Sequence, residues 1–283
     1  MRSLILSLVL LAAPPALAVE AAATNAEEAV VLQDSAALNA ADLDALMAVL
    51  APSLRIYNPP AQPHTLVGPL SQKIGTYEQV RSFFSESFKQ PQGEHHVLDM
   101  VSMGDLVLAH VQYRKPGETA THQMLTGFRV RNGRIEAIWH IARLDNAAVD
   151  SGAAAQAVIR RFNQAADRND VETFLALFAP DARNFHFRNA PDAFGGGPSK
   201  SITDAASRER VFRQMFAERP ARIQALDGLA VGEWVVSHDR ATQQDGTVSE
   251  GLSIYRVQDG RIVDDWYVAE RKLPPAANAA AAR

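Results

Sequence analysis

The sequence predicts an α+β protein made of two copies of one domain. Residues 41–52 and 169–180 spell nearly the same pattern at an offset of 180 − 52 = 128 positions. A second pattern, Gly-Arg-Ile followed by Trp, ends at Trp139 and again at Trp266, an offset of 266 − 139 = 127. Each copy has three helical patterns followed by a run of strand patterns, the order of an α+β domain. The period is too long for solenoids or propellers, whose repeats are about 20 to 50 residues long.

The composition is that of an ordinary globular protein. The 283 residues are 47% hydrophobic and 21% charged, and the length agrees with two domains. The net charge is −4 and no cluster of Lys and Arg is present, which argues against a nucleic-acid partner. The sequence has no cysteine, so disulfides, thiol catalysis and cysteine metal sites are excluded.

The first 18 residues have the pattern of a cleaved signal peptide. Arg2 precedes an apolar run over residues 4–11, and Ala16 and Ala18 are the small residues that a signal peptidase accepts. The alternative is an uncleaved anchor, but the apolar run is far shorter than the roughly 20 residues of a spanning helix. We therefore predict cleavage after Ala18, a periplasmic or secreted protein, and no membrane attachment after cleavage.

The second copy gives the order of the elements. Apolar residues at helical spacing predict a helix over 153–168, and Asp170 is placed to cap a short second helix that ends at Pro180. A short strand over 183–187, a glycine-rich loop and a third helix over 204–218 follow. Hairpin signals such as Asp-Gly then separate four predicted strands: 222–231, 233–243, 247–257 and 261–270.

The first copy repeats this order. Helices are predicted over 26–39, 42–50 and 76–88, and strands continue to about residue 144. The chain is thereby divided into a signal peptide, a first domain, a small polar linker, a second domain and a disordered tail: 1–18, 27–145, 146–152, 153–272 and 273–283.

With this order of elements, the chain resembles the nuclear transport factor 2 (NTF2) superfamily, in its SnoaL-like and ketosteroid-isomerase-like branch. The resemblance rests on the second helix ending in Phe/Leu-Ala-Pro, on the Gly-Arg-Ile-x-x-x-Trp hairpin and on residues 231–238. It implies two cone-shaped domains, each with about three helices packed on a curved antiparallel sheet around a pocket. It also implies that the outer sheet faces form an intramolecular pseudo-dimer, with a homodimer as an open alternative. Because this fold hosts several enzyme classes and pure binding modules, it does not fix the function.

The resemblance also places the isomerase residues. The position of the general base, on the first strand, holds Asn58 beside Tyr57 in the first copy and His186 in the second. An imidazole, with an ordinary pKa of about 6.5, suits proton abstraction and a carboxamide does not. The two oxyanion donors of the isomerase fall at Phe162 and Leu252, so steroid isomerisation of that type is not expected.

Strand alternation extends this placement, because residues two apart in a strand share a face. If Leu252 faces the second pocket, so does Glu250 on the same strand, and the neighbouring strands are expected to add four residues: His238, Trp234, Asp265 and Tyr267. The corresponding first pocket is expected to hold Asn58, His110, Gln123 and His140. The alternative for each strand histidine is a hydrogen bond to a neighbouring group with no role in a pocket.

These residues predict cofactor-free acid–base chemistry on a small, largely apolar organic molecule, by a lyase, dehydratase or isomerase. His186 removes a proton, His238 or Tyr267 donates to the developing oxyanion, and Asp265 orients the imidazole. One alternative is a non-catalytic periplasmic binding or accessory protein, and another is a structural module with filled pockets. No metal is expected, because no zinc-ligand spacing is present and the adjacent His95 and His96 point to opposite faces of a strand.

Overall fold

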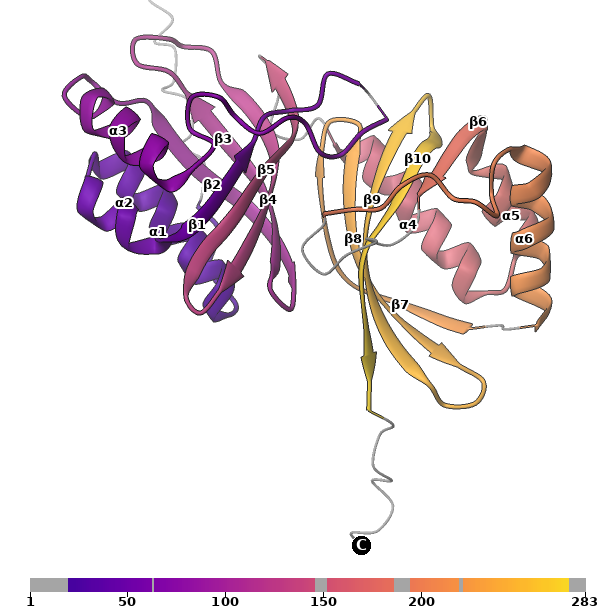
Figure 1. Cartoon of the computed structure of the whole chain (residues 1–283). Coiled ribbons are helices and arrows are strands. Elements are labelled where there is room, and N and C mark those ends of the chain that lie inside the picture. The colour runs from indigo at the N-terminus through magenta and orange to yellow at the C-terminus, as the bar shows by residue number, and fades with distance from the viewer. Residues whose placement is uncertain (1–19, 63, 146–151, 186–193, 219–220, 275–283) are drawn as a thin grey trace, which may run out of the picture.

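Two α+β domains lie side by side in the computed structural model, which describes residues 20–62, 64–145, 152–185, 194–218 and 221–274 (Figure 1). The predicted signal peptide, His186, most of the predicted linker and most of the predicted tail lie outside the described residues. These parts of the sequence-based division stay predictions.

The two domains have the same order of elements. The first consists of α1 (Ala26–Ala40), α2 (Leu43–Val49), β1 (Leu50–Tyr57), α3 (Tyr77–Ser87), β2 (Glu94–Met103), β3 (Leu106–Arg114), β4 (His122–Arg131) and β5 (Arg134–Asp145). The second consists of α4 (Ala153–Asp167), α5 (Val171–Ala176), β6 (Phe178–Phe185), α6 (Ala205–Glu218), β7 (Ala221–Val231), β8 (Trp234–Gln243), β9 (Val248–Gln258) and β10 (Arg261–Leu273).

Local sequence signals account for several element boundaries. The carboxylate of Asp170 accepts a hydrogen bond from the backbone N–H of Thr173 at 3.0 Å, which is the predicted cap of α5. The β9–β10 hairpin turns at Asp259 and Gly260, with φ of 49° and 73°. Positive φ at both central residues is typical of the tight turns that join antiparallel strands, and Asp-Gly favours them.

The segment around Pro180 differs from the prediction. α5 ends at Ala176 and β6 begins at Phe178, so Pro180 lies inside a strand and does not end the helix. Proline lacks the N–H that a central strand needs and is tolerated at a sheet edge. β6 is such an edge strand.

Each domain has one five-stranded sheet, in the order β1-β5-β4-β3-β2 or β6-β10-β9-β8-β7. Neighbouring strands are antiparallel except at one edge, where β1 pairs parallel with β5 and β6 with β10. The helices cover the face of each sheet that lies away from the other domain (Figure 1). The predicted α+β class and the division into two domains of the same plan are confirmed, and the parallel edge pair is an addition to the prediction.

The opposite faces of the two sheets pack against each other through an apolar core that both domains supply. Phe194 of the second domain stacks on Trp139 of the first, with ring centroids 4.5 Å apart. Within the second domain, Trp266 stacks on Phe185 and Trp234 at 4.9 and 5.5 Å. The two domains therefore form a pseudo-dimer inside one chain.

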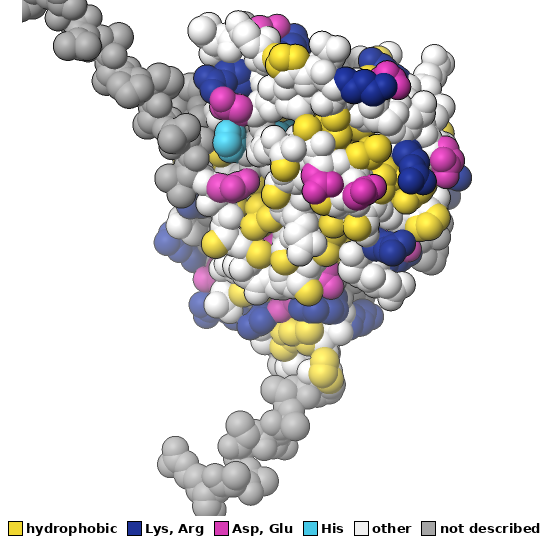
Figure 2. All heavy atoms as spheres, turned by 90° about the vertical axis from the view of Figure 1, so that its left-hand side faces the viewer, with side chains coloured by type: hydrophobic (Ala, Val, Ile, Leu, Met, Phe, Trp, Pro, Cys, Tyr) yellow, Lys and Arg dark blue, Asp and Glu magenta, His cyan; other side chains and the backbone are white. Residues whose placement is uncertain are grey.

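The outer surface is mixed in character. Seen from the helical side of the first domain, hydrophobic side chains lie among acidic and basic ones (Figure 2). Leu70 and Met215 are the large hydrophobic side chains that stand out among the described residues, each 41% exposed. None of the described helices is long and apolar enough to cross a membrane.

Candidate functional site

The first domain encloses a cavity of about 120 Å³ between its helices and the concave face of its sheet. The walls are mostly apolar and include Leu46 and Leu50 from the α2–β1 segment. Four polar side chains also line the cavity: Asp34, His95, Thr126 and His140. A few polar side chains in the wall of a mostly apolar, concave pocket are typical of a small-molecule site.

Asp34 projects into this cavity from the buried face of α1. Its side chain is 5% exposed, and burial raises the pKa of its carboxyl group from 3.8 to about 7. Within the described part of the chain, no hydrogen bond to this carboxyl group offsets the cost of its burial. The group is therefore close to half ionised at neutral pH, a suitable state for moving a proton.

Two uncharged histidines line the same cavity. The pKa of both His95 and His140 is lowered to about 4. Burial is the largest cause for both residues, and the nearby His140 contributes to the shift of His95. The Ser35 hydroxyl donates to the backbone carbonyl of His95 and lies 3.0 Å from its Nδ1. Because a hydroxyl has only one proton, Nδ1 of His95 is the donor in this contact and Nε2 is left as an acceptor.

Two buried polar atoms of the cavity have no partner among the described residues, Nδ1 of His140 and Oγ1 of Thr126. A buried donor left without a hydrogen bond costs about 1–3 kcal/mol. The cavity therefore contains one ionisable carboxyl group, that of Asp34, and two neutral polar atoms that can donate hydrogen bonds. Such a set can accept a proton from a bound molecule and stabilise the negative charge that develops on it.

The interior of the second domain is filled by aromatic rings. Phe162 and Phe174 stack at 4.2 Å, and Phe212 and Phe216 each lie 4.9 Å from Phe174. A pocket of about 210 Å³ remains beside them, with Asp239 and Tyr267 in its lining. Hydrogen bonds from Asn163 and Ser237, both 2.7 Å, hold the Asp239 carboxylate, whose pKa burial raises to about 6.

Four of the sequence-predicted residues point into a domain interior as expected. His140 lines the first-domain cavity, and Phe162 and Tyr267 line the second-domain pocket. Asp265 is fully buried, accepts a 3.0 Å hydrogen bond from the Asn184 amide and has a pKa raised by burial to about 7. Their predicted roles in catalysis or binding stay predictions.

The prediction that Trp234, His238 and Leu252 on β8 and β9 face the second-domain pocket is wrong. Trp234 and Leu252 belong to the core between the two domains, and His238 and Glu250 lie at the same alternation of these strands. Nε2 of His238 lies 3.7 Å from the Glu250 carboxylate, which binds Arg240 and Arg271. Glu250 lies at the edge of the second-domain pocket, but its carboxylate is bound by these two arginines. Since alternation has period two, an alignment error of one residue moves a whole strand to the other face.

Four first-domain predictions also fall outside the cavity, those for Asn58, Tyr57, His110 and Gln123. Asn58 is exposed, and Tyr57 stacks on Trp139 at 6.1 Å beside the core between the domains. Nε2 of His110 lies 2.7 Å from the Gln123 side chain, on the sheet face that packs against the second domain. His110 thus matches the alternative of a strand histidine that is bonded to a neighbour.

His186 lies outside the described residues, so its predicted role as a base stays a prediction. No group of three or more possible metal ligands lies together in the part of the chain that the structure describes.

Sequence reasoning missed Asp34, although a signal for it was present. Val30, Val31, Ala37 and Asp34 share the buried face of α1, and an acidic residue at such spacing stands out on an apolar stripe. His95 was considered only as half of a histidine pair. Thr126 gave no signal, because a single threonine in a strand is common.

The chain belongs to the SnoaL-like domain family, whose model matches residues 32–138 and residues 159–265. One match falls in each domain.

Each of three solved structures matches less than half of the chain. A loop-truncation variant of IdmH is 28% identical, with a TM-score of 0.33, and the match covers 40% of this chain and 91% of that one. RV0760c from Mycobacterium tuberculosis is 16% identical, with a TM-score of 0.36 and coverage of 43% and 98%. An NTF2-like protein of unknown function from Mesorhizobium loti is 22% identical, with a TM-score of 0.36 and coverage of 44% and 97%. No curated protein matched the chain.

Proposed function

We propose that the first domain carries out cofactor-free acid–base chemistry on a small, neutral, largely apolar organic molecule, as a lyase, dehydratase or isomerase. The observation that carries this proposal is the carboxyl group of Asp34, which lines an apolar cavity with a pKa of about 7. A general base works best when its pKa lies near the working pH.

Asp34 removes a proton next to a carbonyl or a leaving group of the bound molecule. Thr126 and His140 then donate hydrogen bonds to the oxygen on which negative charge develops, since both present polar atoms without a protein partner among the described residues. A neutral imidazole can act as such a donor. His95, held by Ser35, presents Nε2 as a hydrogen-bond acceptor that orients a hydroxyl group of the bound molecule. The proton that Asp34 has taken up is returned from its carboxyl group, either to a leaving hydroxyl, which departs as water, or to another carbon atom in an isomerisation.

The cavity limits the size and the charge of the substrate. Its volume of about 120 Å³ is near that of an engineered apolar cavity of about 150 Å³ that takes up benzene. An anionic substrate is disfavoured, because ionised Asp34 would repel it in an apolar surrounding. Neutral ring compounds or short chains with a carbonyl or hydroxyl group fit both limits.

The second domain supports the first by packing, and the whole protein acts after export and removal of residues 1–18. The competing scheme, with His186 as the base and Asp265 and Tyr267 as its partners, places the chemistry in the second domain instead. The non-catalytic alternative is a protein that binds the same kind of molecule without proton transfer. All three schemes can be separated with one probe.

The test follows hydrogen–deuterium exchange next to the carbonyl of cyclohexanone in D₂O by NMR. The wild-type protein is expected to accelerate exchange above the buffer rate, and Asp34→Asn to lower the acceleration about 10²–10⁴-fold. Asp239→Asn is the matched control, because it removes a buried carboxyl group of raised pKa from the second domain, and it should leave exchange unchanged. Loss of exchange in His186→Ala but not in Asp34→Asn would favour the second-domain scheme. Binding of cyclohexanone without accelerated exchange would favour the non-catalytic one.

A further inference from the structure

The junction between the two domains contains a cleft that is separate from the cavity of the first domain. Its volume is about 930 Å³, within the range of about 300–1,000 Å³ typical of small-molecule sites. The first domain supplies residues 62 and 64–67 to its lining. The second domain supplies residues of β6, the segment 194–199 and the start of α6.

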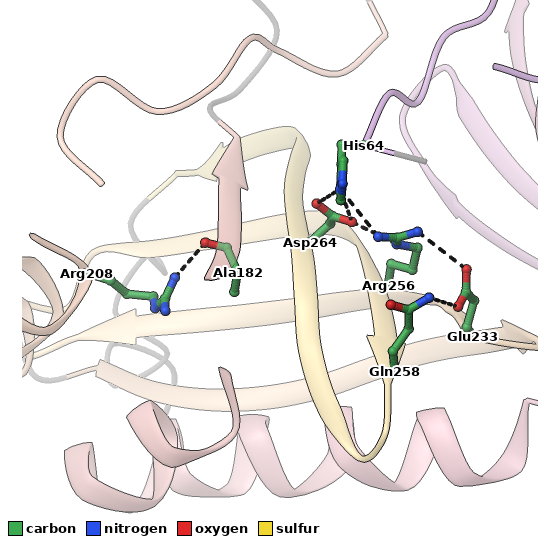
Figure 3. Close-up of polar contacts among 7 residues, drawn as sticks. All are labelled: His64, Ala182, Arg208, Glu233, Arg256, Gln258 and Asp264. Carbon is green, nitrogen blue, oxygen red and sulfur yellow. Dashed lines mark hydrogen bonds and ion pairs between the residues drawn. The ribbon is translucent and has the colours of Figure 1, made fainter. Parts of the chain in front are cut away.

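A histidine–aspartate pair joins the two domains at this cleft (Figure 3). Nδ1 of His64, from the first domain, lies 2.9 and 3.0 Å from the two carboxylate oxygens of Asp264 on β10. Asp264 is completely buried, and Nε of Arg256 also donates to it at 2.8 Å. Arg256 lies 3.7 Å from the Glu233 carboxylate at its other end. The carboxylate of Asp264 is therefore held in place before any ligand binds.

This contact fixes the roles of the two ring nitrogens of His64. Nη2 of Arg256 also lies 3.3 Å from this Nδ1, and a guanidinium only donates, so the two contacts demand opposite roles of the nitrogen. The contacts with the Asp264 carboxylate are shorter, and an ionised carboxylate only accepts hydrogen bonds, so we assign the proton to Nδ1. In the neutral ring, Nε2 is then left with a free lone pair. His64 lines the cleft and its side chain is 30% exposed. A buried aspartate that orients an imidazole in this way is the arrangement that makes histidine a hydrogen-bond acceptor and base in catalytic triads.

The walls of the cleft indicate the kind of molecule that fits. Leu66, Phe194 and Trp266 supply apolar surface, whereas Thr65 supplies a hydroxyl group at the rim. The charged lining residues include both signs, such as Asp181 and Arg183, so the cleft does not select for an ion. These walls suit a neutral molecule with an apolar body and a polar group at one end.

We propose that the cleft is a second ligand site, formed by both domains, which binds neutral hydroxylated organic molecules through a hydrogen bond from the ligand hydroxyl to Nε2 of His64. The site does not depend on the chemistry proposed for the first-domain cavity. It exists only in the tandem arrangement, because His64 and Asp264 come from different domains.

A purely structural role for the pair is the competing explanation, and the chain contains a matched control for it. His122 makes a similar contact inside the first domain, with its Nδ1 2.6 Å from an Asp145 oxygen. His122 does not line the cleft. A binding effect that is specific to His64 therefore cannot be attributed to the loss of a histidine–aspartate contact as such.

The experiment uses 2-naphthol as the probe and follows the full-length protein by calorimetry and by NMR of ¹⁵N-labelled histidine rings. Wild type should bind one molecule in the cleft and shift the Nε2 resonance of His64. His64→Gln should weaken binding about tenfold or more, whereas His122→Gln and Asp34→Asn should bind like wild type. Thr65→Trp, which narrows the cleft and leaves both residues of the pair in place, should also weaken binding and remains informative if His64→Gln is unstable.

Three results would overturn this proposal. One is the absence of any His64 response to the probe up to its solubility limit. Another is unchanged affinity in Thr65→Trp. The third is loss of binding in Asp34→Asn alone, which would place the probe in the first-domain cavity.

Discussion

The interiors of the two domains differ although their backbones follow the same plan. Asp34, Leu46 and Leu50 of the first domain correspond, at an offset of 128, to Phe162, Phe174 and Phe178 of the second. The three phenylalanines pack together, with ring centroids 4.2–5.8 Å apart. The smaller side chains of the first domain leave a cavity of about 120 Å³ at these positions, whereas the second-domain pocket of about 210 Å³ lies beside the rings, against Phe162 and Phe174.

The difference shows how one fold can be used for packing in one copy and for a site in the other. Large aromatic side chains bury much apolar surface and fix the core. Removing ring volume at three positions leaves space for a ligand, and Asp34 then places a carboxyl group in that space.

Truncating side chains at matched positions tests whether the two interiors are packed differently. Phe174→Ala removes a ring that packs against four other phenylalanines and should lower the free energy of unfolding by about 3–5 kcal/mol, whereas Leu46→Ala enlarges the first-domain cavity and should cost about 2 kcal/mol. Urea unfolding followed by circular dichroism measures both. Equal losses would mean that the two interiors are packed alike.

Asp34 should lower stability at high pH, because burial raises the pKa of its carboxyl group from 3.8 to about 7. The unfolded chain loses this proton first as pH rises, so the penalty grows between these two values and is complete above the upper one. Asp34→Asn should therefore stabilise the protein by up to about 4 kcal/mol near pH 8.5, and by little near pH 4. A stabilisation that does not change with pH, measured by thermal melts across this range, would contradict the burial of an ionisable group.

The two cavity histidines should lower stability on the acid side. Burial lowers the pKa of His95 and His140 from 6.5 to about 4, so the unfolded chain takes up protons first as pH falls. Each imidazole should cost up to about 3 kcal/mol between these values. His140→Gln should flatten this part of the stability curve, and His122→Gln serves as the control. An unchanged slope in His140→Gln would mean that His140 is not held neutral.

Filling the cavity should remove its activity without touching Asp34. Leu46→Phe introduces the residue that the second domain has at the matched position and should lower cyclohexanone exchange about tenfold, at a stability cost of about 1–3 kcal/mol. Phe174→Leu is the reciprocal control and should leave exchange unchanged. Full activity in Leu46→Phe would show that the exchange reaction does not take place in the cavity.

Most of the fold could be predicted from the sequence, because its signals are local. The Asp170 cap and the Asp259-Gly260 turn depend on residues close in sequence. The repeat also predicts the same order of elements in both copies. Pro180 misled the prediction, because tolerance of proline depends on whether the strand lies at an edge. That property follows from the pairing of β6 with β10, which is a contact between distant segments.

The site was predicted less well, because facing is decided by register. The assumption that Leu252 faces the second pocket also placed His238 and Trp234 on the wrong face of the sheet. The expected facing of Tyr267 and His140 agrees with the pockets, because each lies next to a tryptophan, Trp266 or Trp139, that packs in the core between the domains. Asp265 is buried but does not line the second-domain pocket. The cleft at His64 depends on how the two domains meet, and no local pattern contains that information.

The central claim is that the first domain, and not the second, holds the ligand. Methyl NMR of the full-length protein during titration with cyclohexanone tests it most directly, because both interiors contain isoleucine methyl groups to compare. We expect shifts at Ile56 and Ile138, which line the first cavity, and none at Ile223 in the second-domain pocket. Shifts at Ile223 without shifts at Ile56 and Ile138 would contradict the account.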